Sequence, residues 1–545
     1  MKRKNKQAIW IGIIMFVIAI VSFVYWSRQK QVWFCDEVYT YESSNGFEQP
    51  WPATYTAQWM SGEDVERYLA ADSDNLSFQT ISANLYSDHV PLYFWIFRLV
   101  SFFFFHGSGS IWIGFVINLV FYLVFVGVLY KVLLHLTDSA SVSGVIVLLS
   151  AVANRLMLEQ IMTLRMYMML LLGEGLLLLA GFLILRDLER KKMRPGAFVF
   201  LYLISVFGLL THYHYWVFYA ATAFVFCMWM LLCAWRKEKK KFLKTLEIRS
   251  VIAWVGNFIA SLLTTILLFP YCRWNLNRGK GEMALSAVFD FSAKKIKDIL
   301  WGYERLSAVI FGDGFPAILG LVIIFGFSIA GGILLYKKKD YGRFTCLVIT
   351  VAISQLYQLV VCFTLPAGGE ERYLWGPFTF LTVCMLWGAA LVLKTVFSGV
   401  KADKPRCMGL RVAATVLTVA MLMNQWLIVD GGNGIAYLFQ QGKDVTLLEE
   451  HRELPWLVDG AAVDASCYFD WLIPEQICFV SGEKSEADAQ AVQVLKDKEA
   501  FVLYAVPDLA DDMIAFLEET LGRELSCEKL TQSTKMLVYV VKKAE

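Results

Sequence analysis

Two adjacent carboxylates, Asp36 and Glu37, are the first residues whose types and position suggest chemistry. They lie in the stretch WFCDEVYTYESSN, residues 33–45, shortly after the apolar run 8–26. A carboxylate at a membrane surface can take the proton of an alcohol, which is a poor nucleophile at neutral pH. The alternative interpretation is a pair of solvated loop charges. The polar residues that the fold brings to the same surface decide between the two.

Four more stretches place polar and aromatic residues at the ends of expected membrane spans. They are YSDHVPLYFWIF at 86–97, TLRMYMMLLL at 163–172, LLTHYHYWVF at 209–218 and ERYLWGPF at 371–378. The residues in them that we predict to contact a substrate are Asp88, His89, Arg165, Tyr167, His212, Tyr213, Arg372 and Tyr373. Guanidinium groups at such positions suit a phosphate. Alternatively, the arginines anchor the chain at the interface, and the histidines and tyrosines belong to an aromatic belt.

The composition sets the class of protein. Of 545 residues, 57% are hydrophobic and only 18% are charged, and the mean hydropathy is +0.52, which together indicate a polytopic membrane protein. A net charge of +2, with the basic residues in short clusters, argues against nucleic-acid binding. The eleven cysteines follow no metal-ligand spacing, so we predict neither a metal site nor a cofactor.

Apolar runs predict about eleven membrane spans. The first, residues 8–26, follows MKRKNKQ and lacks a small-residue cleavage site, so we interpret it as a retained signal anchor. The others lie near 109–134, 141–158, 166–185, 197–211, 213–234, 251–270, 316–336, 344–365, 376–396 and 409–429. The segment 91–105 is short and carries Arg98 at its centre, so we expect it to lie in the interface.

Basic clusters assign the two sides of the membrane. With 91–105 in the interface, one side holds MKRKNK at the start and the clusters at 186–192, 235–241, 336–343 and 401–406. The positive-inside rule makes that side, and with it the N-terminus, cytoplasmic in a multi-pass plasma-membrane protein. The loop 27–108 and the tail 430–545 are then extracytoplasmic. Arg28 and Lys30 go against this trend.

The tail 430–545 differs in composition from the membrane domain 1–429, and we expect a small α/β domain there. Runs 501–507 and 536–542 read as buried strands, and 508–521 reads as an amphipathic helix with Asp508 as its N-cap and Gly522 after it. An oxidising compartment would allow a bridge between Cys467 and Cys478, whereas a reducing one would leave both thiols free.

The order and common sidedness of these stretches resemble one known family. Residues 1–400 are similar to the polyprenyl-phosphate-sugar-dependent glycosyltransferases of the GT-C class, which include protein O-mannosyltransferases and lipid A aminoarabinose transferases. The resemblance implies that Asp36 is the first acid of the family's DE pair and acts as base, with Glu37 as the second acid. It aligns Arg372 with an Arg-Tyr pair and His89 with a histidine that precedes Pro-Leu-Tyr. Thr163 stands where relatives often have glutamate, and nothing carries that role over to Glu159.

The resemblance implies an integral membrane glycosyltransferase with an α-helical, GT-C-like bundle. Its donor would be a polyprenyl-phosphate sugar such as an undecaprenyl-phosphate sugar, and its acceptor an extracytoplasmic hydroxyl of a glycan, lipid or protein. Inversion in a single displacement is the expected stereochemistry. The outer turns show no acidic pair of the metal-binding type. A lipid or glycan transporter is the alternative, although transporters tend to carry charged residues and breaks at mid-bilayer. Compact loops indicate a bacterial protein.

Overall fold

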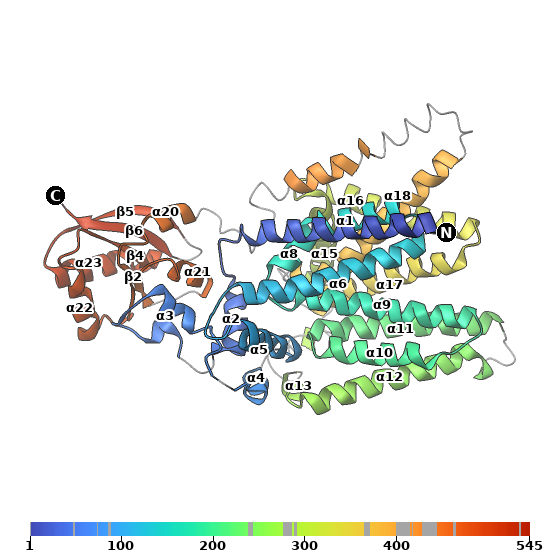
Figure 1. The fold of residues 1–545 in the computed structure, drawn as a ribbon, viewed down its shortest axis with the longest axis horizontal. Helices are drawn as coiled ribbons and strands as arrows, with labels where there is room; N and C mark the ends of the chain where they lie inside the picture. Colours follow the sequence, from blue (N-terminus) through green and yellow to red (C-terminus); the bar gives the residue numbers. More distant parts are fainter. Residues whose placement is uncertain are drawn as a thin grey trace.

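Long apolar helices form the larger part of the protein (Figure 1). The computed structural model describes residues 2–46, 50–73, 75–85, 89–237, 243–275, 286–287, 292–364, 371–398, 415–416, 418–427, 444–460, 465–532 and 536–544. Eight helices in these ranges are long and apolar enough to cross a membrane. They are α1 (Lys2–Ser27), α6 (Trp112–Thr137), α9 (Tyr167–Glu189), α11 (Tyr213–Lys237), α12 (Leu246–Leu268), α16 (Ala317–Lys337), α17 (Tyr341–Thr364) and α18 (Trp375–Ser398). The prediction of a polytopic helical membrane protein is confirmed.

Two of the remaining predicted spans differ from a long straight helix, one by a bend and the other by its length. The run 141–158 is not one straight helix, because α7 (Ala140–Val147) and the π-helical turn Leu148–Val152 are followed by α8 (Arg155–Met162) across a 55° bend. Asn154 causes the break, since its side chain accepts from the backbone N–H of Leu156 and so starts a new helix. Helix α10 (Pro195–Leu209) is apolar but shorter than the others. In the predicted run 409–429, the described residues 415–416 and 418–427 are helical.

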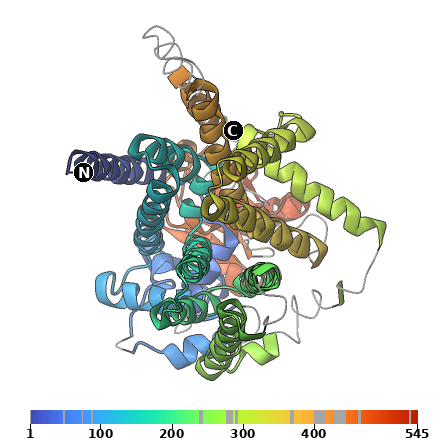
Figure 2. The same ribbon diagram turned by 90° about the vertical axis from the view of Figure 1, so that its right-hand side faces the viewer.

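The bundle has two chemically different ends. The turns after α6, α9 and α16 meet at one end, where Arg343 Nη2 donates to Asp138 Oδ2 at 2.6 Å and a Cβ on Gly342 would lie 3.5 Å from Glu189. The N-terminus of α1 lies at this same end, and the β-sheet lies beyond the opposite end (Figure 1). Seen end on, the helices pack side by side around the bundle axis (Figure 2). The predicted basic clusters at 186–192 and 336–343 therefore share the end away from the sheet.

The first loop folds into short helices that cap the sheet-facing end of the bundle. They are α2 (Cys35–Ser44), α3 (Gly62–Arg67), α4 (Phe78–Asn84) and α5 (Leu92–Phe104). Arg98, at the centre of α5, is fully buried, and its Nη2 donates to Ser73 Oγ at 2.9 Å and to Asn75 O at 2.7 Å. Because both acceptors belong to the same loop, α5 has its charge satisfied outside the bilayer. This agrees with an interfacial position for 91–105.

The C-terminal region folds on a six-stranded sheet of order β1-β3-β2-β4-β6-β5. Its strands are β1 (Trp59–Met60), β2 (Trp456–Asp459), β3 (Ile477–Val480), β4 (Ala500–Ala505), β5 (Leu525–Gln532) and β6 (Leu537–Lys543). Strands β3, β2 and β4 are parallel and their apolar residues are buried on both faces, as central parallel strands require. The short strand β1 comes from the first loop and pairs antiparallel with β3. The sheet thus ties that loop to the tail.

The predicted secondary structure of the tail is confirmed, with one correction. Helix α23 (Ala510–Leu521) ends at Gly522, whose φ of 62° gives the left-handed cap, but its N-cap is Leu509 and not Asp508. Asp508 lies instead in the preceding 3₁₀ turn Pro507–Leu509. Cys467 and Cys478 are both free and lie in different hydrophobic clusters, so no bridge joins them.

The other described elements are short or peripheral. They are α13 (Cys272–Asn275), α15 (Ala293–Phe311), α20 (Val445–Glu450), α21 (Tyr468–Trp471), α22 (Glu486–Val492), and the 3₁₀ turns Pro52–Thr54, Glu371–Leu374, Ala465–Cys467 and Gln493–Leu495. Among them α15 and the turn Glu371–Leu374 lie beside the site described below.

The contact between the first loop and the tail gives a test of this fold. A Cβ on Gly62 would lie 2.7 Å from the backbone oxygen of Leu472, so Gly62→Val must separate α3 from the tail domain. We expect a loss of about 1–3 kcal/mol in stability, as for other overpacked contacts, and faster proteolysis of the first loop. Thermal unfolding and limited proteolysis measure both. Gly256→Ala, where a Cβ meets nothing within 4 Å, is the control. Equal stability of the two variants would contradict this packing.

Candidate functional site

Five segments that are far apart in sequence meet at the sheet-facing end of the bundle. They are the start of α2, the residues before α5, the turn before α9, the turn before α11 and the 3₁₀ turn Glu371–Leu374 before α18. The last three lie where the membrane helices α9, α11 and α18 begin, so the bundle itself gathers them. Of the predicted residues, the structure brings together Asp36, His89, Arg165, Tyr167, His212, Arg372 and Tyr373.

The centre of the site is an ion pair between Asp36 and Arg372. Arg372 Nη1 donates to Asp36 Oδ2 at 2.6 Å, and the arginine is only 4% exposed. Aromatic rings surround its guanidinium, whose Cζ lies 5.2 Å from the ring of Phe34, 5.8 Å from Tyr167 and 5.4 Å from Tyr373. Ring faces attract a cation and restrict its movement. Arg372 is therefore a fixed positive charge and not a mobile interfacial anchor.

A second buried arginine, Arg165, lies on the other side of Asp36. Its Nη1 donates to the backbone oxygen of Asp36 at 2.7 Å and to Thr40 Oγ1 at 2.8 Å. Its Nη2 lies 3.9 Å from Asp36 Oδ2 and 3.2 Å from His89 Nε2. Because a guanidinium only donates, His89 Nε2 is the acceptor, which puts the proton of the neutral ring on Nδ1. His89 thus orients Arg165.

The two oxygens of Asp36 differ in their surroundings. Oδ2 is occupied by Arg372, whereas among the described residues Oδ1 has only the weak thiol contact of Cys35 at 3.9 Å. The side chain is 23% exposed, so part of the carboxylate remains accessible to a ligand. A hydroxyl that approaches the site could donate to Oδ1.

Glu37, the neighbouring acid, has a different environment. Its side chain is fully buried, and it accepts from Lys30 Nζ at 3.0 Å and from the backbone N–H groups of Leu164 and Phe34 at 2.8 and 2.9 Å. Burial raises the pKa of this carboxyl, and the Lys30 charge and the hydrogen bonds act in the opposite direction. No substrate can reach it in this arrangement. The geometry thus favours a positioning role for Glu37 over the catalytic role that the sequence suggested.

Both histidines of the pair lie beside Tyr373, so His214 joins the predicted His212 at the site. His212 Nδ1 accepts from the backbone N–H of His214 at 3.0 Å, and the ring of His214 stacks on Tyr373 at 4.2 Å. Tyr213, between them, packs against Trp216 at 5.8 Å. His214 therefore belongs to the aromatic wall beside Arg372. In the sequence, His214 was marked only by its position two residues after His212, at the start of α11. Asp88, which we predicted to contact a substrate, lies outside the described residues.

A row of charges behind Arg372 was missed by sequence reasoning. Glu371 accepts from Arg305 Nε at 2.6 Å, Arg305 Nη1 donates to Asp313 at 2.7 Å, and Asp313 also accepts from Arg155 at 3.4 Å. These residues come from α8, α15 and two turns, and no short motif links them. The network holds Glu371, and through it the backbone of Arg372, against the bundle.

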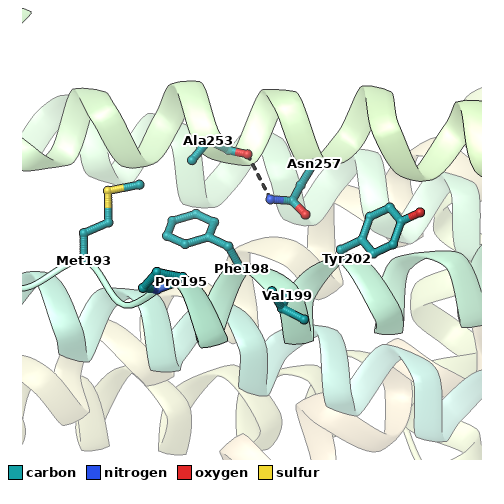
Figure 3. A pocket seen from close by; sticks show the side chains of 7 residues that line it. All are labelled: Met193, Pro195, Phe198, Val199, Tyr202, Ala253 and Asn257. Atoms are coloured by element: carbon teal, nitrogen blue, oxygen red, sulfur yellow. Dashed lines mark hydrogen bonds between the residues drawn. The ribbon is translucent and has the colours of Figure 1, made fainter.

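The described residues contain no group of three or more His, Cys, Asp or Glu side chains that would hold a metal ion. A hollow of 540 Å³ lies between α10 and α12, lined by Met193, Pro195, Phe198, Val199, Tyr202, Ala253 and Asn257 (Figure 3). Asn257 donates to Ala253 O at 3.1 Å and the Tyr202 hydroxyl pairs with Thr264 at 2.7 Å. With its polar groups paired and its walls apolar, this hollow suits lipid tails and no chemistry.

Comparison with known proteins gives structural matches only. No protein-family model and no curated protein matches the sequence. ArnT from Cupriavidus metallidurans is similar in fold at 12% identity over 97% of each chain, with a TM-score of 0.46 when bound to undecaprenyl phosphate and 0.48 in the apo state. The archaeal oligosaccharyltransferase AglB from Archaeoglobus fulgidus, in complex with an inhibitory peptide and a dolichol-phosphate, is similar at 10% identity over 96% of this chain and 70% of its own, with a TM-score of 0.45. Similarity at this level carries no function, so the function is argued from the site.

The buried His212 gives a prediction on pH. Burial, and after it the charges of His214, His89, Arg165 and Arg372, lower the pKa of His212 well below its usual 6.5. Below pH 6.5 the unfolded chain therefore takes up a proton that the folded chain refuses, and stability falls with pH. Between about pH 7.5 and about pH 5.5, His212→Gln should lose less of its melting temperature than the wild type. His106 is exposed, so His106→Gln should keep the wild-type dependence of the melting temperature on pH. Identical profiles for all three proteins would contradict a buried neutral His212.

Proposed function

We propose that this protein is a membrane glycosyltransferase that moves a sugar from a polyprenyl-phosphate donor to an acceptor hydroxyl. The observation that carries the proposal is the Asp36 carboxylate, which has one oxygen held by Arg372 and the other open, between two buried arginines at one end of a membrane bundle. The arginines suit a lipid phosphate at the bilayer boundary. The open oxygen suits an alcohol.

The chemistry follows from these two roles. The acceptor hydroxyl donates its proton to Asp36 Oδ1 as its oxygen attacks the anomeric carbon of the donor. The bond from that carbon to the phosphate oxygen breaks, and the phosphate leaves with the electron pair. Arg372 and Arg165 stabilise the negative charge that it gains. Attack opposite the leaving phosphate inverts the anomeric centre in one displacement. The phosphate needs little protonation, so a second carboxylic acid is not required.

Arg372 has two partners in this scheme. In the unliganded site it neutralises Asp36, and a bound phosphate would compete for the same donors. Binding of the donor would then weaken the hold on Asp36 at the moment when that carboxylate must accept a proton. The aromatic rings around Arg372 keep its charge in place during this exchange of partners.

The proposal also includes the orientation of the protein in the membrane and the chemical class of its donor and acceptor. The positive-inside rule places the N-terminus in the cytoplasm and the site and tail domain outside. The donor is a polyprenyl-phosphate sugar, undecaprenyl-linked in a bacterium, whose chain stays in the bilayer. The acceptor is an extracytoplasmic glycan, lipid or protein. The transporter alternative is less favoured, since the described charged groups gather at the two ends of the bundle, apart from Glu174, which is buried within α9.

The first test is the Asp36→Asn variant, which keeps the shape of the side chain and removes its charge. We expect the rate of sugar transfer to fall about 10²–10⁴-fold, the usual contribution of a general base. A radiolabelled-sugar assay with purified protein in lipid and a panel of undecaprenyl-phosphate sugars measures it. Binding of undecaprenyl phosphate should persist in the variant. Full activity of Asp36→Asn would refute the role of this base.

The second test concerns the leaving phosphate. Arg372→Ala removes a charged donor, so affinity for undecaprenyl phosphate should fall about 10- to 100-fold, the equivalent of about 1.4–2.8 kcal/mol. Arg343→Gln, at the opposite end of the bundle, is the control and should bind like the wild type. Titration of each protein in nanodiscs gives the affinities. Unchanged binding by Arg372→Ala would leave this arginine with an anchoring role only.

A further inference from the structure

Lys30 and Glu37 form an ion pair that is completely shielded from solvent. Lys30 Nζ lies 3.0 Å from Glu37 Oε1, and the side chains are 1% and 0% exposed. Lys30 follows α1 at the sheet-facing end of the bundle, where we expected few basic residues. A buried ion pair of this kind seldom stabilises a fold more than apolar residues of equal volume would. Its presence therefore calls for an explanation other than stability.

The pair joins three segments of the chain through its remaining hydrogen bonds. Glu37 also accepts from the backbone N–H of Leu164 at 2.8 Å and from that of Phe34 at 2.9 Å. Lys30 Nζ donates to the backbone oxygen of Met162 at 3.3 Å. The end of α1, the start of α2 and the turn before α9 thus share one network. Its bonds to the turn go to backbone atoms, so it fixes the path of that chain segment.

These three segments carry the groups that the proposed reaction needs. Asp36 is the residue before Glu37, and Arg165 is the residue after Leu164. Arg165 Nη1 lies 2.7 Å from the backbone oxygen of Asp36, a spacing that depends on how the α2 start sits against the turn. We propose that Lys30 and Glu37 are positioning residues that set the geometry between Asp36 and Arg165. The inference rests on the proposed function and explains why an acid that no substrate reaches stands beside the base.

The alternative roles of the pair make different predictions. If Glu37 were itself the base, Glu37→Gln would act like Asp36→Asn, and Lys30→Met would matter little. If the pair were only structural, the charge-free double variant Lys30→Met/Glu37→Gln would recover both stability and rate, because no unpaired charge stays buried. For positioning, the double variant recovers most of the stability but not the rate. The backbone N–H groups of Leu164 and Phe34 bond to different oxygens of Glu37, Oε1 and Oε2. In the glutamine one of these oxygens is an NH₂ group, which cannot accept, so one of the two attachments is lost.

The experiment compares Lys30→Met, Glu37→Gln and the double variant with the wild type. Glu247→Gln is the matched control, since Glu247 pairs with Lys237 at 2.6 Å at the other end of the bundle. The assays are melting temperature, kcat and KM for transfer from the undecaprenyl-phosphate sugar that the wild type uses, and hydrogen exchange of the peptides that contain Phe34 and Leu164. We expect the double variant to melt closer to the wild type than either single variant, because only one backbone hydrogen bond and no ion partner is lost. Its kcat should be about 10²-fold lower than that of the wild type, the usual effect of a misplacement near 1 Å. Its KM should change less than kcat, and exchange should rise only in those two peptides.

The hydrogen-exchange measurement tests this inference independently of the proposed function. If the wild type transfers no sugar from any donor, the function fails, and the pair is still judged by the exchange of Phe34 and Leu164. Unchanged exchange in every variant overturns the inference, as does a double variant with wild-type kcat. Loss of transfer in Glu37→Gln with full activity in Lys30→Met overturns it too, because Glu37 would then act without its partner. Glu247→Gln should match the wild type in all assays.

Discussion

The ion pair between Asp36 and Arg372 is the interaction on which the arrangement of the site depends. It joins residues 336 positions apart, from the first loop and from the turn before α18. Each of the two charges has lost most of its water, and a buried charge without a partner is costly. The first loop cannot lie elsewhere without breaking this ion pair and separating Arg372 from Asp36. The need to pair these two charges thus fixes how the first loop packs against the turn before α18.

The charged residues around this ion pair also need partners, and each of them has a different kind of partner. Arg165 is satisfied by neutral oxygens and a histidine nitrogen, so its charge stays available to an incoming anion. Glu371 is satisfied by Arg305, which removes a competing acid from beside Arg372. Glu37 is neutralised by Lys30 and cannot compete with Asp36 for a substrate. Among these acids Asp36 is the most exposed, with 23% of its side chain accessible against 18% for Glu371 and 0% for Glu37.

Much of this arrangement could be predicted because the bilayer simplifies the problem. Apolar length identifies the spans, the basic clusters pair their ends, and residues at the same ends must then be neighbours, which is how Asp36, Arg165 and Arg372 were selected together. The role of Glu37 could not be predicted in this way, because Asp36 and Glu37 are chemically alike and differ only in burial. The sequence marked Lys30 as a basic residue on the side where the positive-inside rule expects few. Its pairing with Glu37 could not be predicted, because it depends on tertiary structure. The Arg305 and Asp313 network has no local pattern, since its members meet only through helix packing.

The tail domain is more than a separate module beyond one end of the bundle. Its sheet is completed by β1 from the first loop, and the ring of Trp33 lies 6.0 Å from Tyr468 and 4.7 Å from Tyr41 of α2. Trp33 stands between Lys30 and Asp36 in the chain, so the tail domain contacts the segment that carries Asp36. A shift of the tail domain would therefore displace α2 and change the position of Asp36 relative to Arg372.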